Sequence, residues 1–210
     1  RQLLVRRPGQ RPGIANPNLV SFTDILPTFL HLAGTSPEPD KRRGRSLLPI
    51  LEAETLLPGW DRIFGSHTFH EITNYWPTRF LRTPRYKYHR NIAWQLDFPF
   101  SGDLYGSLSW EGIRRQRPAM IGQRSVSDYV RRLPEELYDL DADPHEVTNL
   151  ATDPDHAEHL MGFRAELEAW QRETDDPWLY RDGVSVRAVR HHLPNGLSLP
   201  DRFDFDPTDP

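Results

Sequence analysis

Proline constrains the fold of this chain more than any other residue type. The 210-residue sequence contains 20 prolines, about twice the usual share of roughly 5%. Because proline lacks a backbone N–H and disrupts helix interiors, this density argues for many turns and against a helical bundle or a coiled coil. Six Trp, seven Tyr and ten Phe can still build a core, so the mean hydropathy of -0.69 does not indicate wholesale disorder.

The clearest helix lies between two of these prolines. Residues 156–174 carry an apolar stripe at helical spacing, made of Leu160, Phe163, Leu167 and Trp170. Asp153-Pro154 is typical of a helix start, and Asp176-Pro177 ends the pattern. A second helix is predicted over 21–34, where Ser21 and Asp24 have capping-box spacing, and a short helix with a turn over 47–57.

The remaining periodic segments predict strands. We expect them at 2–6, 63–73, 79–82, 86–89 and 136–140, with the third and fourth forming a hairpin. Residues 97–134 show no sustained period and predict a long excursion with one helix near 126–133. The polar, proline-rich tail at 181–210 is typical of a loop or disordered segment.

The net charge of -4 conceals a gradient along the chain. The net charge is +5 over residues 1–50, +4 over 51–134 and -13 over 135–210. Arginine dominates the basic residues and suits bidentate binding of sulfate, carboxylate or phosphate, although a solvated surface is the simpler interpretation. No compact basic stripe is interleaved with aromatic residues, so the sequence does not support nucleic-acid binding.

Several absences exclude classes of structure and of chemistry. The chain has no cysteine, so it forms no disulfide, no cysteine-ligated zinc site and no thiol nucleophile. No run of about 18 apolar residues occurs, so we expect no membrane span. No Gly-x-Ser-x-Gly motif and no phosphate-binding glycine loop is present either.

The densest group of ionisable residues is His67-Thr-Phe-His70-Glu71. On a strand, His67 and Glu71 would share one face and His70 would lie on the other. A zinc-protease motif would need a second histidine at position 74, which is Asn. Two interpretations stay open: ordinary surface polar residues, or a pocket wall that hydrogen-bonds a polar ligand. A calcium loop beginning at Asp139 is rejected because position 144 is Pro and position 150 is Leu.

Several segments, taken in order, resemble the C-terminal part of the type I sulfatases, in the alkaline-phosphatase-like superfamily. They are residues 3–9, 19–34 and 44–49, then Arg-Thr-Pro-Arg-Tyr-Lys-Tyr (82–88), then Glu-Leu-Tyr-Asp-Leu-Asp-Ala-Asp-Pro-His-Glu-Val-Thr-Asn-Leu-Ala (136–151). Residues 64–73 and 170–178 are similar to the heparan N-sulfatase branch. The resemblance covers about residues 1–180.

The resemblance implies an α+β architecture with two parts and a tail. Residues 1–57 would be the last strand and helices of an α/β alkaline-phosphatase-like catalytic domain. Residues 58–180 would be the C-terminal subdomain, an antiparallel sheet with a packed helix, and 181–210 the tail. Because the chain starts at Arg1 without an initiator Met, we expect it to be a piece of a larger protein.

The resemblance also implies where the chemistry lies. Family sulfatases use calcium and a formylglycine made from Cys or Ser in a Cys/Ser-x-Pro-x-Arg motif, and both sites would precede this region. The chain would then supply no catalytic residue, no metal ligand and no turnover of its own. It would supply substrate recognition through His70, Glu71, His67, Asn74 and Arg79. Glu71 would accept hydrogen bonds from sugar hydroxyls or the sulfamate nitrogen, and His70 would orient it or contact the sulfate.

The implied function is hydrolysis of sulfate from a sulfated sugar, with the N-sulfo group of heparan-type glucosamine as the substrate. An O-sulfatase or phosphodiesterase of the same superfamily is an alternative. A carbohydrate-binding module without catalysis is another, although residues 1–57 would then leave a sheet edge unpaired. The expected partners are a sulfated glycosaminoglycan or sugar, the upstream catalytic domain and, in a homodimer, a second copy. The expected location is lysosomal, periplasmic or secreted.

Overall fold

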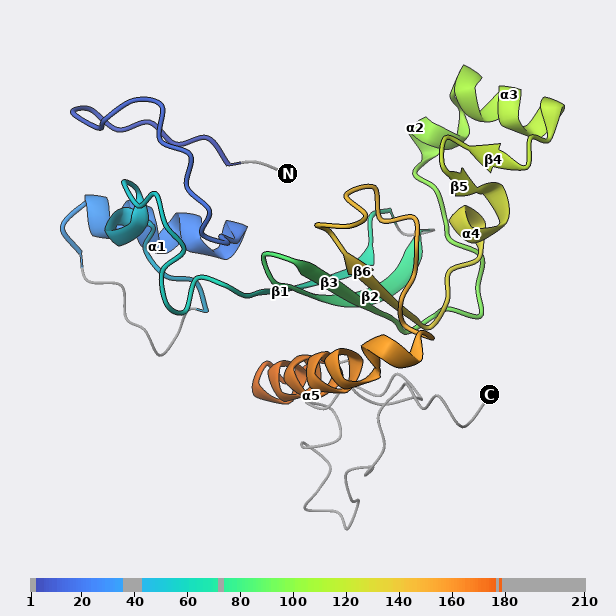
Figure 1. The fold of residues 1–210 in the computed structure, drawn as a ribbon. Helices are drawn as coiled ribbons and strands as arrows, with labels where there is room; N and C mark the ends of the chain where they lie inside the picture. The colour runs from blue at the N-terminus through green and yellow to red at the C-terminus, as the bar shows by residue number, and fades with distance from the viewer. Residues whose placement is uncertain (1–2, 36–42, 72–73, 177, 179–210) are drawn as a thin grey trace, which may run out of the picture. The chain divides into compact units, whose positions relative to one another are not determined.

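The computed structural model describes residues 3–35, 43–71, 74–176 and 178. The chain divides into two compact units, one made of residues 1–63 and 82–84, and the other of 64–81 and 85–210 (Figure 1). The first unit contains the 3-10 helices η1 (Phe22–Asp24) and η3 (Leu48–Ile50) and the α-helix α1 (Ile25–Leu32). Its small core is built on Leu47, Ile50 and Trp60.

The predicted capping box fixes the start of η1, which leads directly into α1. The Ser21 side chain accepts a hydrogen bond from Thr23 N, and Asp24 Oδ2 accepts one from Ser21 N at 2.8 Å. Asp24 is buried, and its other oxygen accepts a hydrogen bond from Arg45 N at 3.0 Å. Gly44 makes this approach possible, because a Cβ there would collide with the Thr23 carbonyl.

One sequence prediction fails in the first unit. The strand expected over 2–6 is not formed by residues 3–6, and Leu4 is 91% exposed. A strand needs a hydrogen-bonded neighbour, and the described part of this unit contains no strand to pair with it. The short helix with a turn expected over 47–57 is present as η3 followed by a turn at 51–52, with Leu47 and Ile50 packed on Trp60.

The second unit is built on a four-stranded sheet. Its strands are β1 (Ile63–Phe69), β2 (Tyr75–Arg82), β3 (Tyr86–Asn91) and β6 (Glu135–Asp139), in the order β1-β2-β3-β6. The hairpin of β2 and β3 and the final strand confirm the predicted antiparallel sheet. The antiparallel register of β3 and β6 places Tyr88 opposite Leu137 and His89 opposite Glu136.

Helix α5 (Ala157–Glu173) covers one face of this sheet, as Figure 1 shows. It follows the 3-10 turn η4 (Pro154–His156), whose cap is the predicted Asp153. Leu160, Phe163 and Leu167 of the predicted stripe are buried against Leu81, Tyr88 and Leu137. Trp170 stacks on Phe64 with ring centroids 5.5 Å apart. Within the described ranges, no helix has the length and apolar character that a membrane crossing would need.

Residues 97–134, termed the insert below, fold into short elements between β3 and β6. They are α2 (Gly102–Tyr105), α3 (Leu108–Gln116), β4 (Met120–Ile121), β5 (Arg124–Ser125) and α4 (Val126–Val130). The prediction of one helix near 126–133 identified α4 and missed the others. Two of these helices begin at serine N-caps, Ser107 and Ser125. The helices are too short to show the long apolar periodicity from which a helix is usually predicted.

The core packing can be tested by one truncation in α5. Leu167→Ala should lower the free energy of unfolding by about 2–5 kcal/mol, because the side chain is fully buried (0% exposed) and its removal leaves a cavity. Met161→Ala on the same helix is the control and should change it by less than about 0.5 kcal/mol, since Met161 is 60% exposed. Chemical denaturation measures both, and equal losses would contradict this packing.

Candidate functional site

Three of the residues predicted to bind substrate line one pocket. His67 comes from β1, His70 follows the end of β1, and Asn74 precedes β2. The pocket has a volume of about 290 Å³, near the lower end of the ~300–1,000 Å³ that is usual for ligand sites. That size suits a single sugar ring. Its other lining residues are Trp76, Phe98, Pro99, Phe100, Ser101, Leu104 and Tyr129.

The pocket lies at a turn and not along a strand face. Strand β1 ends at Phe69, so the expectation that His67 and Glu71 share a strand face is wrong. His70 and Glu71 form a bend, and Asn74 N donates to the Glu71 carbonyl at 2.9 Å. This backbone bond brings the start of β2 back against the end of β1. The turn gathers side chains that a continuous strand over 63–73 would have separated.

Glu71 lies beside the pocket without lining it. Its side chain is exposed, and Oε1 accepts a hydrogen bond from Gly102 N at 3.3 Å. Gly102 follows Ser101, which does line the pocket, so this bond ties the β1–β2 turn to the start of α2 in the insert. A carboxylate in this position can accept hydrogen bonds from hydroxyl or N–H groups of a ligand at the rim.

Arg79 is placed differently from the other predicted residues. It is 3% exposed and binds Asp176 through two hydrogen bonds, from Nε at 2.5 Å and from Nη2 at 2.7 Å. Its Nη1 donates to the carbonyl oxygens of His67 and Thr78. Arg79 therefore supports the backbone under His67 from behind and is not part of the pocket lining.

The charge of Asp176 depends on this arginine. Burial opposes ionisation of the carboxyl, but the hydrogen bonds and charge of Arg79 outweigh it, and the pKa of Asp176 lies below its ordinary value. Gln171 adds a hydrogen bond from its side-chain amide at 3.0 Å. The sequence prediction that Arg79 contacts substrate is thus not supported by its geometry, since four of its hydrogen bonds go to protein atoms.

Sequence reasoning missed the aromatic side of the pocket. Phe98, Phe100 and Tyr129, termed the aromatic wall below, come from the insert. Phe100 and Tyr129 are stacked with centroids 5.3 Å apart, and Phe98 meets Trp76 edge-on at 5.4 Å. The run Asp97-Phe98-Pro99-Phe100 was the available signal, because two aromatics around a proline in a polar segment favour a fixed surface feature.

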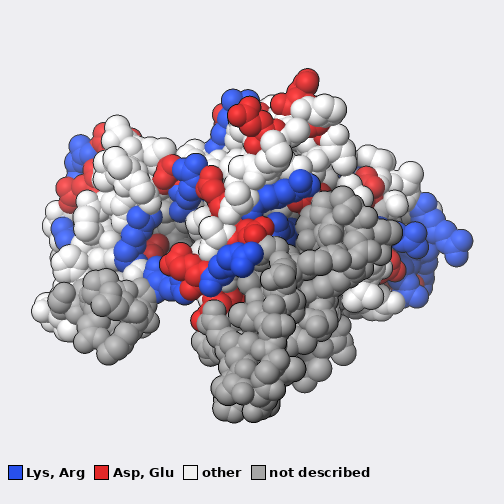
Figure 2. Space-filling view, turned by 90° about the horizontal axis from the view of Figure 1, so that it is seen from below, with Lys and Arg blue, Asp and Glu red and all other residues white. Residues whose placement is uncertain are grey.

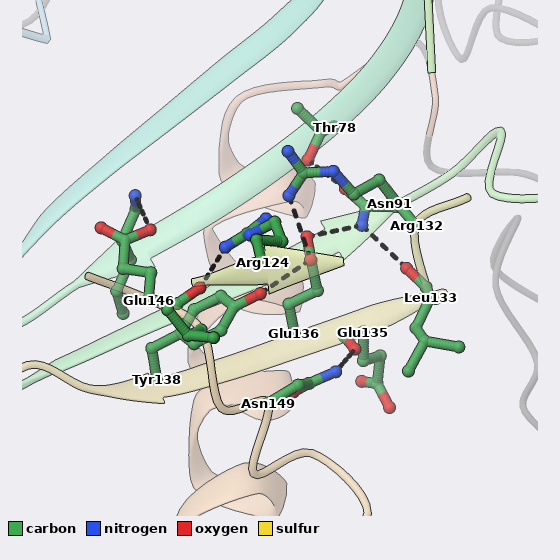
Figure 3. A network of polar contacts seen from close by, with 12 residues as sticks. Thr78, Asn91, Arg124, Arg132, Leu133, Glu135, Glu136, Tyr138, Glu146 and Asn149 are labelled. Atoms are coloured by element: carbon green, nitrogen blue, oxygen red, sulfur yellow. Dashed lines mark hydrogen bonds and ion pairs between the residues drawn. The ribbon is translucent and has the colours of Figure 1, made fainter. Parts of the chain in front are cut away.

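A polar network centred on Glu136 (Figure 3) is linked to the aromatic wall by Arg132. Glu136 is buried on β6 and accepts hydrogen bonds from Asn91, Tyr138 and Arg132 at 3.0, 2.8 and 3.2 Å. The guanidinium of Arg132 lies 5.1 Å from the ring centre of Phe98. Glu136 therefore holds the guanidinium of Arg132 in place, and that guanidinium packs on Phe98 of the aromatic wall.

The same network sets the ionisation of Glu136 and Tyr138. Burial opposes the charge of Glu136, but Arg132 and the hydrogen bond from Asn91 outweigh it and hold its pKa below the ordinary value. Burial and the neighbouring Glu136 charge raise the pKa of Tyr138. Tyr138 is therefore a neutral hydrogen-bond donor at physiological pH, which is the state the network requires.

Comparison with known proteins identifies the family. No family model matches the chain. Human N-sulphoglucosamine sulphohydrolase is 37% identical to it over 199 residues, which are 87% of this chain and 38% of that protein. An ulvan-active sulfatase from Formosa agariphila is 28% identical over 79% of this chain and 31% of its own length. Over most of its length, the chain is homologous to sulfatases.

The chain spans less than two fifths of the length of those two relatives. A solved structure of a 2-O GAG sulfatase has a TM-score of 0.48 and 26% identity, over 74% of this chain and 25% of that one. The relatives confirm the family that the ordered motifs of the sequence predicted.

The pocket does not have the ligand set of a calcium site. Calcium takes six to eight oxygen ligands, whereas this pocket offers two imidazoles, one amide, the hydroxyl groups of Ser101 and Tyr129, and aromatic rings. Among residues 3–35, 43–71, 74–176 and 178, no group of three His, Cys, Asp or Glu side chains could hold a metal ion. The chemistry that the pocket can perform is hydrogen bonding and stacking.

The structural role assigned to Arg79 can be tested through its partner. Asp176→Asn should lower the free energy of unfolding by about 3 kcal/mol, because it leaves a buried guanidinium without a counter-charge. Glu168→Gln is the control, since its ion pair with Arg172 is exposed and should contribute less than about 1 kcal/mol. Denaturation in urea measures both. A loss as small as that of the control would show that the Arg79–Asp176 pair does not hold the fold.

The stability should also depend on His89 in mildly acidic solution. Burial, together with the positive charge of Lys87, lowers the pKa of His89 from 6.5 to about 4. The unfolded chain therefore binds a proton first, so stability present above pH 6.5 is lost as the pH falls toward 4, by roughly 1–3 kcal/mol. His89→Gln should flatten the stability profile in this window, and His145→Gln, at an exposed histidine, should not. If the stability of His89→Gln fell with pH as steeply as that of the wild type, His89 would not be the group that causes this loss.

Proposed function

We propose that this chain is the C-terminal part of a sulfatase that removes sulfate from a sulfated sugar, and that it forms one wall of the substrate pocket. The observation that carries the proposal is the convergence of His67, His70 and Asn74 on one sugar-sized pocket in a sulfatase homologue. Imidazole and amide groups suit hydroxyl and sulfate oxygens, because they can donate hydrogen bonds to them and can also accept hydrogen bonds from hydroxyl groups.

The proposed substrate is the N-sulfo group of a glucosamine. The human relative is named for N-sulphoglucosamine, and its 37% identity extends over 87% of this chain. Glu71 at the rim would accept hydrogen bonds from the sulfamate N–H or a sugar hydroxyl, and His70 would contact the sulfate. A charge-assisted hydrogen bond of this kind contributes about 1.5–3 kcal/mol.

The nucleophile and the metal site are proposed to lie in sequence that precedes this region, so the chain alone would have no turnover. The family's formylglycine, as a hydrated aldehyde, would attack sulfur, and calcium would polarise the sulfate oxygens. One stretch here, Ser198 to Arg202, has the bare Ser-x-Pro-x-Arg spacing. It lies outside the described residues and serves below as a control.

The proposed partner of the first unit is the catalytic domain of the same protein. One side of η1 and α1 presents four exposed apolar side chains at helical spacing: Phe22 at 75% exposure, Leu26 at 55%, Phe29 at 63% and Leu32 at 51%. An apolar stripe of this kind marks an interaction surface more often than a solvated helix face. Dimer formation and a lysosomal, periplasmic or secreted location stay predictions from the family.

An O-sulfatase is the second candidate. The relative from Formosa agariphila is named for ulvan, a different substrate, and still shares 28% identity over 79% of this chain. The region is therefore compatible with more than one sulfated sugar. A panel of N-sulfated and O-sulfated saccharides, offered to the full-length protein, separates the two candidates.

Glu71→Gln in the full-length protein tests the proposed role. The KM for N-sulfoglucosamine should rise about tenfold because the charge-assisted hydrogen bond is lost. Glutamine keeps an acceptor for Gly102 N, so the link to the insert should survive. The KM for O-sulfated sugars should change less than the KM for N-sulfoglucosamine.

Two variants serve as controls for this experiment. Glu158→Gln removes an exposed carboxylate on α5 and should leave both KM and kcat unchanged. Ser198→Ala should also leave activity intact, whereas its complete loss would place the nucleophile inside this chain. Normal kinetics in Glu71→Gln would remove Glu71 from the substrate site. Inactivity of the wild type on every sulfated sugar would overturn the proposed function.

A further inference from the structure

The pocket has two chemically different sides. His67, His70 and Asn74 give one side hydrogen-bonding groups, whereas the aromatic wall of Phe98, Phe100 and Tyr129 gives the other an apolar surface. A pyranose ring has the same asymmetry, because its axial C–H groups form apolar patches on the ring faces while its hydroxyl groups project around the edge. The pocket therefore matches a sugar in chemistry as well as in size.

The aromatic wall is distinct from the hydrophobic core. The core cluster under α5 is built from side chains that are at most 7% exposed, such as Tyr88 and Leu167. The three rings of the wall are only partly buried, and all three line the pocket. Aromatic groups that stay partly exposed in a fixed cluster beside polar groups are typical of a recognition surface.

The wall is also held in position before any ligand arrives. Phe98 N donates to the Val130 carbonyl at 2.7 Å, which closes the base of the insert. Arg132 lies within 5.1 Å of the Phe98 ring centre and 5.8 Å of the Tyr129 ring centre while it pairs with Glu136. Trp110 of α3 packs on Phe100 from within the insert, at 4.3 Å between centroids. Preorganised rings bind a sugar without a further loss of side-chain entropy.

We propose that the aromatic wall is the platform on which the sugar ring of the substrate lies, with Tyr129 as its central contact. His67, His70 and Asn74 then meet groups at the edge of the same ring. The inference rests on the proposed function for the identity of the sugar. It assigns a specificity role to the insert, on which neither the sequence motifs nor the family resemblance placed any binding residue.

Substitution of Tyr129 in the full-length protein tests the platform. Tyr129→Ala should raise the KM for N-sulfoglucosamine about tenfold with little change in kcat, because ring contact serves binding and not bond cleavage. Tyr129→Phe keeps the ring and should stay within about twofold of the wild type. Tyr105→Ala is the matched control, since Tyr105 is 56% exposed in the same insert and does not line the pocket.

Direct binding separates this inference from the proposed function. Titration of the N-sulfoglucosamine monosaccharide, followed by calorimetry, should show weaker binding for Tyr129→Ala than for Tyr105→Ala. An unchanged KM and affinity in Tyr129→Ala, beside a raised KM in Glu71→Gln, would overturn the platform and leave the proposed function intact. Weakened binding in a protein that hydrolyses no sulfated sugar would uphold the platform and overturn the function. A fall in melting temperature without any change in binding would show that the wall is only structural.

Discussion

The alternation of side chains along β3 and β6 is the constraint on which the second unit depends. Successive residues of a strand point to opposite faces, so Tyr88 and Leu137 face α5 whereas His89 and Glu136 face the other way. The first face buries the helix stripe against Tyr88 and Leu137. It also carries Arg90 and Glu135, which bond to Gln171 and Arg164 of α5. The second face is polar and needs partners, because a buried carboxylate without hydrogen bonds is costly. The insert supplies one of them, Arg132, and the pocket is thereby fixed to the sheet.

The charge gradient of the sequence takes on a structural meaning in this arrangement. Basic residues before position 135 pair with acidic residues after it: Arg79 with Asp176, Arg85 with Asp139, Lys87 with Glu146 and Arg132 with Glu136. Four ion pairs therefore join the two sign-biased segments inside one unit, and Figure 2 shows both signs side by side on the surface. Removing one partner of a buried pair such as Arg79–Asp176 would leave the other charge uncompensated, which is costly.

The elements that the sequence predicted well are those specified by local signals. The stripe from Leu160 to Trp170, the Asp153 cap and the Ser21 capping box each need only neighbouring residues, and all are present. The strand at 2–6 failed because a strand depends on a partner that local patterns do not reveal. The short elements of the insert lacked a period altogether, so their caps were the only available signal.

The sequence by itself determined the family, the antiparallel sheet with its helix, and the grouping of His67, His70 and Asn74 as candidate site residues. It could do so because ordered motifs and periodicity are written in neighbouring positions. Only the tertiary structure decided that Arg79 is committed to Asp176, and that Phe98, Phe100 and Tyr129 complete the pocket. Those outcomes depend on contacts between residues about 30 to 100 positions apart, which patterns of neighbouring residues do not specify.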